Sequence, residues 1–120
     1  MFVPPGGRPT PHRHDFEEMF TLLEGAVEFT FRGETRNVAT GVSLNIPSNA
    51  PHSFKNKSGK TARLLCLCTP AGQEDFFMEV GVPVASRTAP ATKLTKDEEE
   101  ASIKKAVALA PRYRTELLRP

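Results

Sequence analysis

Residues 6–25 read GGRPTPHRHDFEEMFTLLEG, and this stretch does most to decide the fold and the site. It places His12 and His14 two residues apart and Glu18 four residues later, between Gly6 and Gly25. Alternate residues of a β-strand point to the same face, so the two imidazoles and the carboxylate can converge on one point. Such donors suit a divalent metal, although a His-x-His pair alone is a weak signal.

The composition favours one small domain built from strands and turns. The chain has 120 residues, among them 11 prolines, 8 glycines and 8 phenylalanines, with no tryptophan. This length is enough for a single core, and the proline and glycine content disfavours a helical bundle.

The charges do not indicate a nucleic-acid site. Sixteen basic and 14 acidic side chains give a net charge of +2, and the basic residues are scattered. We interpret the densest basic group as a solvated loop; it comprises Lys55, Lys57, Lys60 and Arg63. We therefore expect no nucleic-acid partner.

Two further features concern the cellular setting. No apolar stretch approaches the roughly 20 residues that cross a bilayer, and the opening MFVPP lacks the features of a signal peptide. We expect no membrane partner and a cytoplasmic protein. Cys66 and Cys68 share one face of a strand and are badly placed for a mutual disulfide, so we expect reduced thiols. Small apolar packing explains the pair, and a metal or redox pair is the alternative.

Hydrophobic alternation predicts a succession of strands. They cover residues 10–14, 18–23, 26–31, 34–38, 42–46, 52–56 and 63–68. In the strand at 42–46 we expect Val42, Leu44 and Ile46 to point inward. The strands at 18–23 and 63–68 are apolar on both faces, so their outer sides should be covered.

The C-terminal third has helical signals instead. Residues 73–80 have apolar side chains at helical spacing, which predicts a short helix. Thr95 and Glu98 form a capping-box signature for a second helix over 96–110, ended by Pro111. Its expected apolar stripe consists of Ile103, Val107 and Ala110. Residues 112–120 give no strong signal, although Leu117 and Leu118 could pack on a neighbour.

A second motif lies one hairpin beyond the first. It reads Gly41-x5-Pro47-x-Asn49-x2-His52-x3-Asn56. The two motifs together resemble those of the cupin superfamily, with every spacing kept. The resemblance implies an all-β fold, a small antiparallel jelly-roll β-barrel over residues 1–70, followed by a helical extension over 71–120 that packs on the barrel or on a partner chain.

The sequence departs from the cupin pattern at two positions. Asn49 stands where the family usually has glycine, and because asparagine tolerates a positive φ, the turn should survive. Val42 stands where many cupins have aspartate, which puts only a loop contact in doubt. We expect Asn56 to fix the backbone near the second motif instead of contacting a ligand.

The resemblance implies a metal site inside the barrel. Its ligands would be His12, His14, Glu18 and His52, and the strand patterns also send each of them inward. The cofactor would be one divalent transition metal, Fe, Mn, Ni, Co, Cu or Zn, which ligand type alone does not separate. A metal-free polar pocket is the alternative. We expect Phe20, Phe29, Phe31 and Phe54 to line the cavity, with ordinary core packing as an equal alternative.

The favoured function is that of a metal-dependent, dioxygenase-like oxidoreductase acting on a small aromatic molecule. Residues 69–81 loosely resemble the segment that follows the barrel in small bacterial cupins grouped with quercetin dioxygenases. Glu18 could leave the metal and act as a base. One alternative is a non-catalytic binding or sensor protein. Another is an isomerase or lyase in which Glu18 or His52 moves a proton.

The start of the chain raises a question about assembly. Cupin barrels normally have leading strands, yet only five residues precede Gly6. Either those strands are missing or the encoded start lies upstream of Met1. We expect a homodimer in which a second chain covers the exposed edge.

Overall fold

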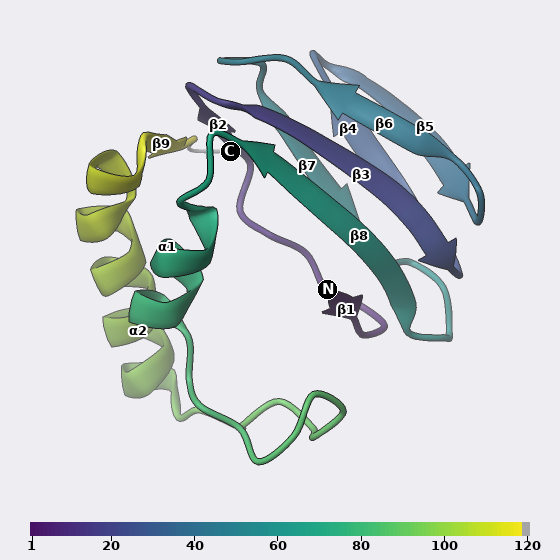
Figure 1. Ribbon diagram of the computed structural model, residues 1–120. Helices are drawn as coiled ribbons and strands as arrows, with labels where there is room; N and C mark the ends of the chain where they lie inside the picture. Colours follow the sequence, from purple (N-terminus) through teal and green to yellow (C-terminus); the bar gives the residue numbers. More distant parts are fainter. Residues whose placement is uncertain (119–120) are drawn as a thin grey trace.

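Two antiparallel sheets form the body of the protein, seen in a computed structural model that describes residues 1–118 (Figure 1). The first sheet has the order β1-β8-β3-β6; its strands are β1 (Phe2–Val3), β8 (Ala62–Thr69), β3 (Glu17–Glu24) and β6 (Ser43–Ile46). The second has the order β5-β4-β7-β2-β9; its strands are β5 (Glu34–Ala39), β4 (Ala26–Phe31), β7 (His52–Lys55), β2 (His12–His14) and β9 (Thr115–Leu117).

The sheets do not close into a barrel, which corrects that part of the prediction. β5 and β6 are edge strands on one side, and β1 and β9 are edge strands on the other; none of these pairs with the opposite sheet in residues 1–118. β1 and β9 have only two and three residues, too few to bridge the sheets by a continuous ladder. The fold is therefore an open two-sheet sandwich.

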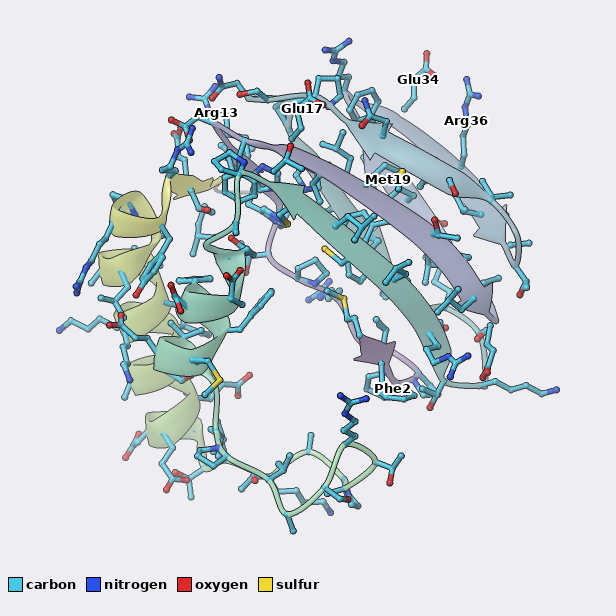
Figure 2. The ribbon with its side chains drawn as sticks, in the orientation of Figure 1. Phe2, Arg13, Glu17, Met19, Glu34 and Arg36 are labelled. Atoms are coloured by element: carbon cyan, nitrogen blue, oxygen red, sulfur yellow. The ribbon has the colours of Figure 1, made fainter. Side chains whose placement is uncertain are left out.

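The core lies between the sheets. Phe20 and Leu22 of β3, Phe29 of β4 and Phe54 of β7 are buried there, and Ile46 of β6 is fully buried. By contrast, Glu34 and Arg36 of β5 project away from the body of the protein (Figure 2). β3 and β4 thus show the predicted alternation, whereas β5 is exposed at every residue except Val38.

All seven predicted strands are found within two residues of their expected ends, and two of the differences have a clear physical cause. β2 begins at His12, not at residue 10, because Pro9 and Pro11 lack the backbone N–H that a ladder needs. Val42 was predicted to point inward and is 42% exposed. It lies in the turn after Gly41, where its N–H donates to the Ala39 carbonyl at 3.2 Å, and β6 begins one residue later.

The predicted helices are present, but one of them presents a different face. α1 (Gln73–Val80) and α2 (Lys96–Leu109) lie side by side next to the sheets, and the Thr95–Glu98 capping box is formed (Figure 1). Ile103 and Val107 of the expected apolar stripe do not face the core, because their side chains are 56% and 52% exposed. Apart from the residues that follow it directly, α2 contacts mainly α1, and its half-buried side chains are Ser102, Ala106 and Leu109; Ala110 is buried as expected.

The last described residues form a strand that the sequence did not reveal. A 3₁₀-helix (Ala110–Tyr113) leads into β9, which pairs with β2 in the register His12↔Leu117 and His14↔Thr115. β9 thus covers the edge of β2 within the same chain. The edge of β2 is therefore occupied, and the homodimer itself stays a prediction.

The outer face of the first sheet is open in this chain. Leu65 and Leu67 of β8 are 46% and 47% exposed, and Met19 of β3, the register partner of Leu67, lies on the same face (Figure 2). The expected cover is therefore absent among residues 1–118. Neither helix in this part of the chain has the length and apolar character needed to span a membrane.

Candidate metal centre

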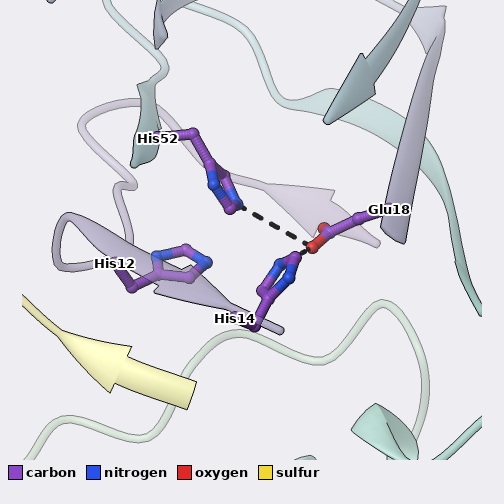
Figure 3. A group of neighbouring side chains, drawn as sticks. All are labelled: His12, His14, Glu18 and His52. Carbon is purple, nitrogen blue, oxygen red and sulfur yellow. Dashed lines mark hydrogen bonds and ion pairs between the residues drawn. The ribbon is translucent and has the colours of Figure 1, made fainter. Parts of the chain in front are cut away.

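Four polar side chains from three strands meet between the sheets. His12 and His14 come from β2, Glu18 from β3 and His52 from β7 (Figure 3). Their ligand atoms all lie within 4.8 Å of one another, and His14, Glu18 and His52 are buried. The two motifs adjoin because β2 and β7 pair with His12 opposite His52. The structure thus brings together all four residues that the sequence singled out as ligands.

Backbone carbonyls set the orientation of all three imidazoles. Nδ1 lies 2.8 Å from the Thr10 carbonyl oxygen in His12, 3.0 Å from the Phe16 carbonyl oxygen in His14, and 2.8 Å from the Ala50 carbonyl oxygen in His52. Because a carbonyl only accepts, each Nδ1 must carry the proton. Nε2 is then the coordinating nitrogen, an arrangement typical of metal-binding histidines.

The Nε2 atoms fit a bound cation. His52 Nε2 is buried without a hydrogen-bond partner in the described chain and lies 3.8 Å from Glu18 Oε2. Leaving such an atom unsatisfied costs about 1–3 kcal/mol. His14 Nε2 makes a very short contact with the same carboxylate oxygen. Since a neutral His14 that donates through Nδ1 has no proton at Nε2, this contact needs a proton between the two atoms or a cation bound by both.

The electrostatics keep three of the four side chains, those of His12, His52 and Glu18, in the state that metals bind. Burial lowers the pKa of His12, and burial together with repulsion from His12 lowers the pKa of His52 to about 4. Burial alone would raise the pKa of Glu18, but the hydrogen bond and charge interaction with His14 outweigh it, and the pKa is lowered. Near neutral pH the site therefore offers neutral His12 and His52 rings and an ionised carboxylate.

The second motif supports the site as expected. Asn56 is fully buried; its amide donates to the Val3 and Lys60 carbonyls at 2.9 and 2.7 Å, and its Oδ1 accepts from the Ser58 N–H at 2.9 Å. Asn49 has φ +64°, which confirms that it replaces glycine in a left-handed turn, and its N–H donates to the His14 carbonyl at 2.7 Å.

A cavity of about 420 Å³ opens beside the cluster. His12 and Glu18 lie on its wall, as do Phe20 and Phe54. The other two phenylalanines of the predicted set lie elsewhere: Phe29 and Phe31 line a separate cavity that borders β5 and β6. Phe29 still packs near the cluster, with its ring centroid 6.4 Å from that of His52.

The remaining wall comes from the N-terminal residues 1–10 and from segments between residues 73 and 117 that the sequence did not assign to the site. Phe76, Phe77 and Val80 of α1, Ala106 of α2 and Leu117 of β9 line the cavity. The apolar spacing of the first three predicted a helix but not its position. Leu117 had no strong sequence signal. The cavity therefore combines a polar end at the cluster with an apolar remainder.

The comparisons with known proteins agree with this architecture. The model of the cupin domain family matches residues 1–68. The HTH-type transcriptional regulator PuuR of Escherichia coli is 36% identical over 58 residues, which cover 48% of this chain and 31% of the regulator. The chain spans less than two thirds of the length of PuuR and of the other curated relatives that it matches.

Solved structures show the same fold. TT1209 from Thermus thermophilus is 30% identical with a TM-score of 0.55, over 57% of this chain and 67% of the other. A predicted oxalate decarboxylase from Thermotoga maritima is 25% identical with a TM-score of 0.55, over 57% of this chain and 60% of the other. With the family model covering more than half of its length, the chain belongs to the cupin family.

Proposed function

We propose that this protein is a metal-dependent, dioxygenase-like oxidoreductase that acts on a small aromatic molecule. The proposal rests on one cavity that has His12 and Glu18 on its wall together with the phenylalanines of β3, β7 and α1. A ligand with one oxygen-bearing end and a flat apolar body matches this division. Its polar end would lie at the cluster and its body among the aromatic rings.

The donor set supports a transition metal as the cofactor. Three imidazoles and one carboxylate suit Fe, Mn, Ni, Co, Cu or Zn, and leave coordination positions free in a five- or six-coordinate ion. When bound, a redox-active ion would supply Lewis acidity toward a substrate oxygen and electron exchange with dioxygen. His12, His14, Glu18 and His52 would hold it.

The chain's own residues have distinct tasks in this proposal. Glu18 accepts a proton from the substrate hydroxyl, since its carboxylate is ionised and borders the cavity. Phe20 and Phe54, whose rings meet edge to face at a centroid distance of 5.6 Å, offer an aromatic ring further edge-to-face contacts and exclude water.

Two measurements test the proposal. Elemental analysis of the purified protein should find a transition metal that the double variant His12→Ala, His52→Ala lacks. Oxygen consumption should follow the addition of flavonols to the protein loaded with Fe, Mn, Ni, Co or Cu. Equal metal content in the two proteins would refute the proposed metal site. Absence of oxygen uptake with all five metals would refute the proposed oxygenase activity.

A non-catalytic ligand sensor is the second candidate, favoured by the similarity to PuuR, a transcriptional regulator. It predicts binding of an aromatic ligand without oxygen uptake and without conversion. Proton-transfer chemistry of the lyase or isomerase type gains support from the likeness to the predicted oxalate decarboxylase. It predicts product under anaerobic conditions, so one anaerobic assay beside the oxygen measurement separates all three.

A further inference from the structure

Glu18 faces a second group of donors on the side turned away from the histidines. Its Oε2 contacts His14, whereas its Oε1 accepts a hydrogen bond from the Cys66 thiol at 3.2 Å. The Cys68 sulfur lies 3.9 Å from that of Cys66. The two sulfurs and a carboxylate oxygen all lie within 4.8 Å of one another.

The ladder between β3 and β8 creates this group. Glu18 lies opposite Cys68 and Phe20 opposite Cys66, and residues two apart on a strand share a face. The thiols are half-buried and free, and they border a cavity of about 520 Å³ that also has Gln73 and Glu74 of α1 on its wall. This cavity gives the thiols a route to solvent that does not pass the histidine cluster.

The spacing of the sulfurs matches that of a tetrahedral thiolate site. With Zn–S bonds of about 2.3 Å and a tetrahedral angle, two thiolates lie about 3.8 Å apart. The Sγ atoms are 3.9 Å apart already. With a Zn–O bond of about 2.1 Å, the sulfur-to-oxygen distance in such a site is about 3.6 Å. The 3.2 Å between Cys66 Sγ and Glu18 Oε1 needs only a small adjustment.

We propose that Cys66, Cys68 and Oε1 of Glu18 form a second metal subsite, for a soft divalent cation such as Zn²⁺ or Cd²⁺. Thiolates select such ions, whereas the histidine cluster accepts a wider range of transition metals. Each thiol would release its proton to solvent on binding, and the adjoining cavity of about 520 Å³ leaves room for a fourth ligand. Glu18 then bridges the two subsites through its two oxygens. The proposal concerns metal binding alone and does not depend on the reaction proposed above.

Cadmium titration of the full chain tests this subsite, because cadmium–thiolate bonds have a charge-transfer absorbance that imidazole and carboxylate ligands lack. The wild type should bind two equivalents and develop the band. Cys66→Ser, Cys68→Ser should bind one equivalent without the band. His12→Ala, His52→Ala should keep the band and lose the other equivalent, so failure of the histidine site is distinguished from failure of this one.

A measurement on the wild type alone guards against variants that do not fold. Cd²⁺ should slow the alkylation of both thiols by iodoacetamide at least tenfold, as measured by mass spectrometry. A band-free titration of the wild type would overturn the proposal. So would unchanged alkylation in the presence of Cd²⁺, or an unchanged stoichiometry in the folded cysteine variant.

Discussion

Acidification from pH 7 to pH 4 should destabilise the metal-free protein, with His52 as a major cause. The His52 side chain is only 3% exposed, and burial together with the neighbouring His12 ring lowers its pKa to about 4. In the unfolded chain the pKa of this group returns to its ordinary value of 6.5. Between these two pKa values His52 is protonated in the unfolded state but not in the folded state. The free energy of unfolding therefore falls as the pH falls through this range.

The size of the effect follows from the shift. At about 1.4 kcal/mol per pKa unit, a lowering from 6.5 to about 4 amounts to roughly 3 kcal/mol. This loss of stability is absent at pH 7 and complete below pH 4. His12, whose pKa is also lowered, adds a loss of the same sign. The loss due to His52 is therefore isolated by comparison with a variant that cannot titrate at this position.

Urea unfolding in the presence of a chelator measures this difference. The free energy of unfolding should be determined at several pH values between 7 and 4 for the wild type and for His52→Gln, which stays neutral and keeps a donor near the Ala50 carbonyl. The wild type should lose about 3 kcal/mol more than the variant over this range. Parallel curves for the two proteins would refute the reasoning, since they would show that His52 titrates normally in the fold.

Three further outcomes are expected. Asn56→Ala should lower the free energy of unfolding by about 4 kcal/mol, at ~1 kcal/mol for each of the hydrogen bonds to its buried side chain; a loss below ~1 kcal/mol in urea unfolding would contradict this. Phe77→Ala should weaken the binding of an aromatic ligand about tenfold, as measured by calorimetry, while Met78→Ala, on the same helix but outside the cavity, should leave it unchanged. Equal affinities of the two variants for the ligand would exclude α1 from the site. For the proposed homodimer, Leu67→Glu on the open face of β8 should give monomers by light scattering, and a wild type that is already monomeric at micromolar concentration would remove the dimer.

The polar end of the site could be predicted because its information is local. Strand alternation decides that His12 and His14 share a face, whatever the strands pair with. Glu18 and His52 follow the same rule on their own strands, and the resemblance of the two motifs to those of cupins then implies that these strands meet. Burial of Phe20 and Phe54 also follows from alternation, so these two phenylalanines of the cavity wall could be predicted as well.

The failures have a different physical origin. Val42 was assigned to a strand because it continues the alternation of 42–46, but the turn after Gly41 with φ +90° delays the strand by one residue. The face of α2 depends on what packs against it. The helix meets mainly α1, so the stripe of Ile103 and Val107 stays exposed within the described chain, and periodicity could not reveal that.

β9 shows most clearly how distant contacts decide the site. Three residues cannot form a stable strand by themselves, and their structure depends on the free edge of β2, about 100 residues earlier in the sequence. Arg114, just before β9, donates a hydrogen bond from its Nε to Asp15 Oδ1 at 2.5 Å and so fixes the segment next to β2. The pairing of Leu117 with His12 then brings Leu117 to the cavity wall. The motifs thus supply the polar end of the cavity together with Phe20 and Phe54, whereas side chains outside the motifs complete its apolar wall. We therefore expect the ligand specificity of this protein to change with substitutions in α1, in β9 and at residues 1–4 before it changes with the motifs.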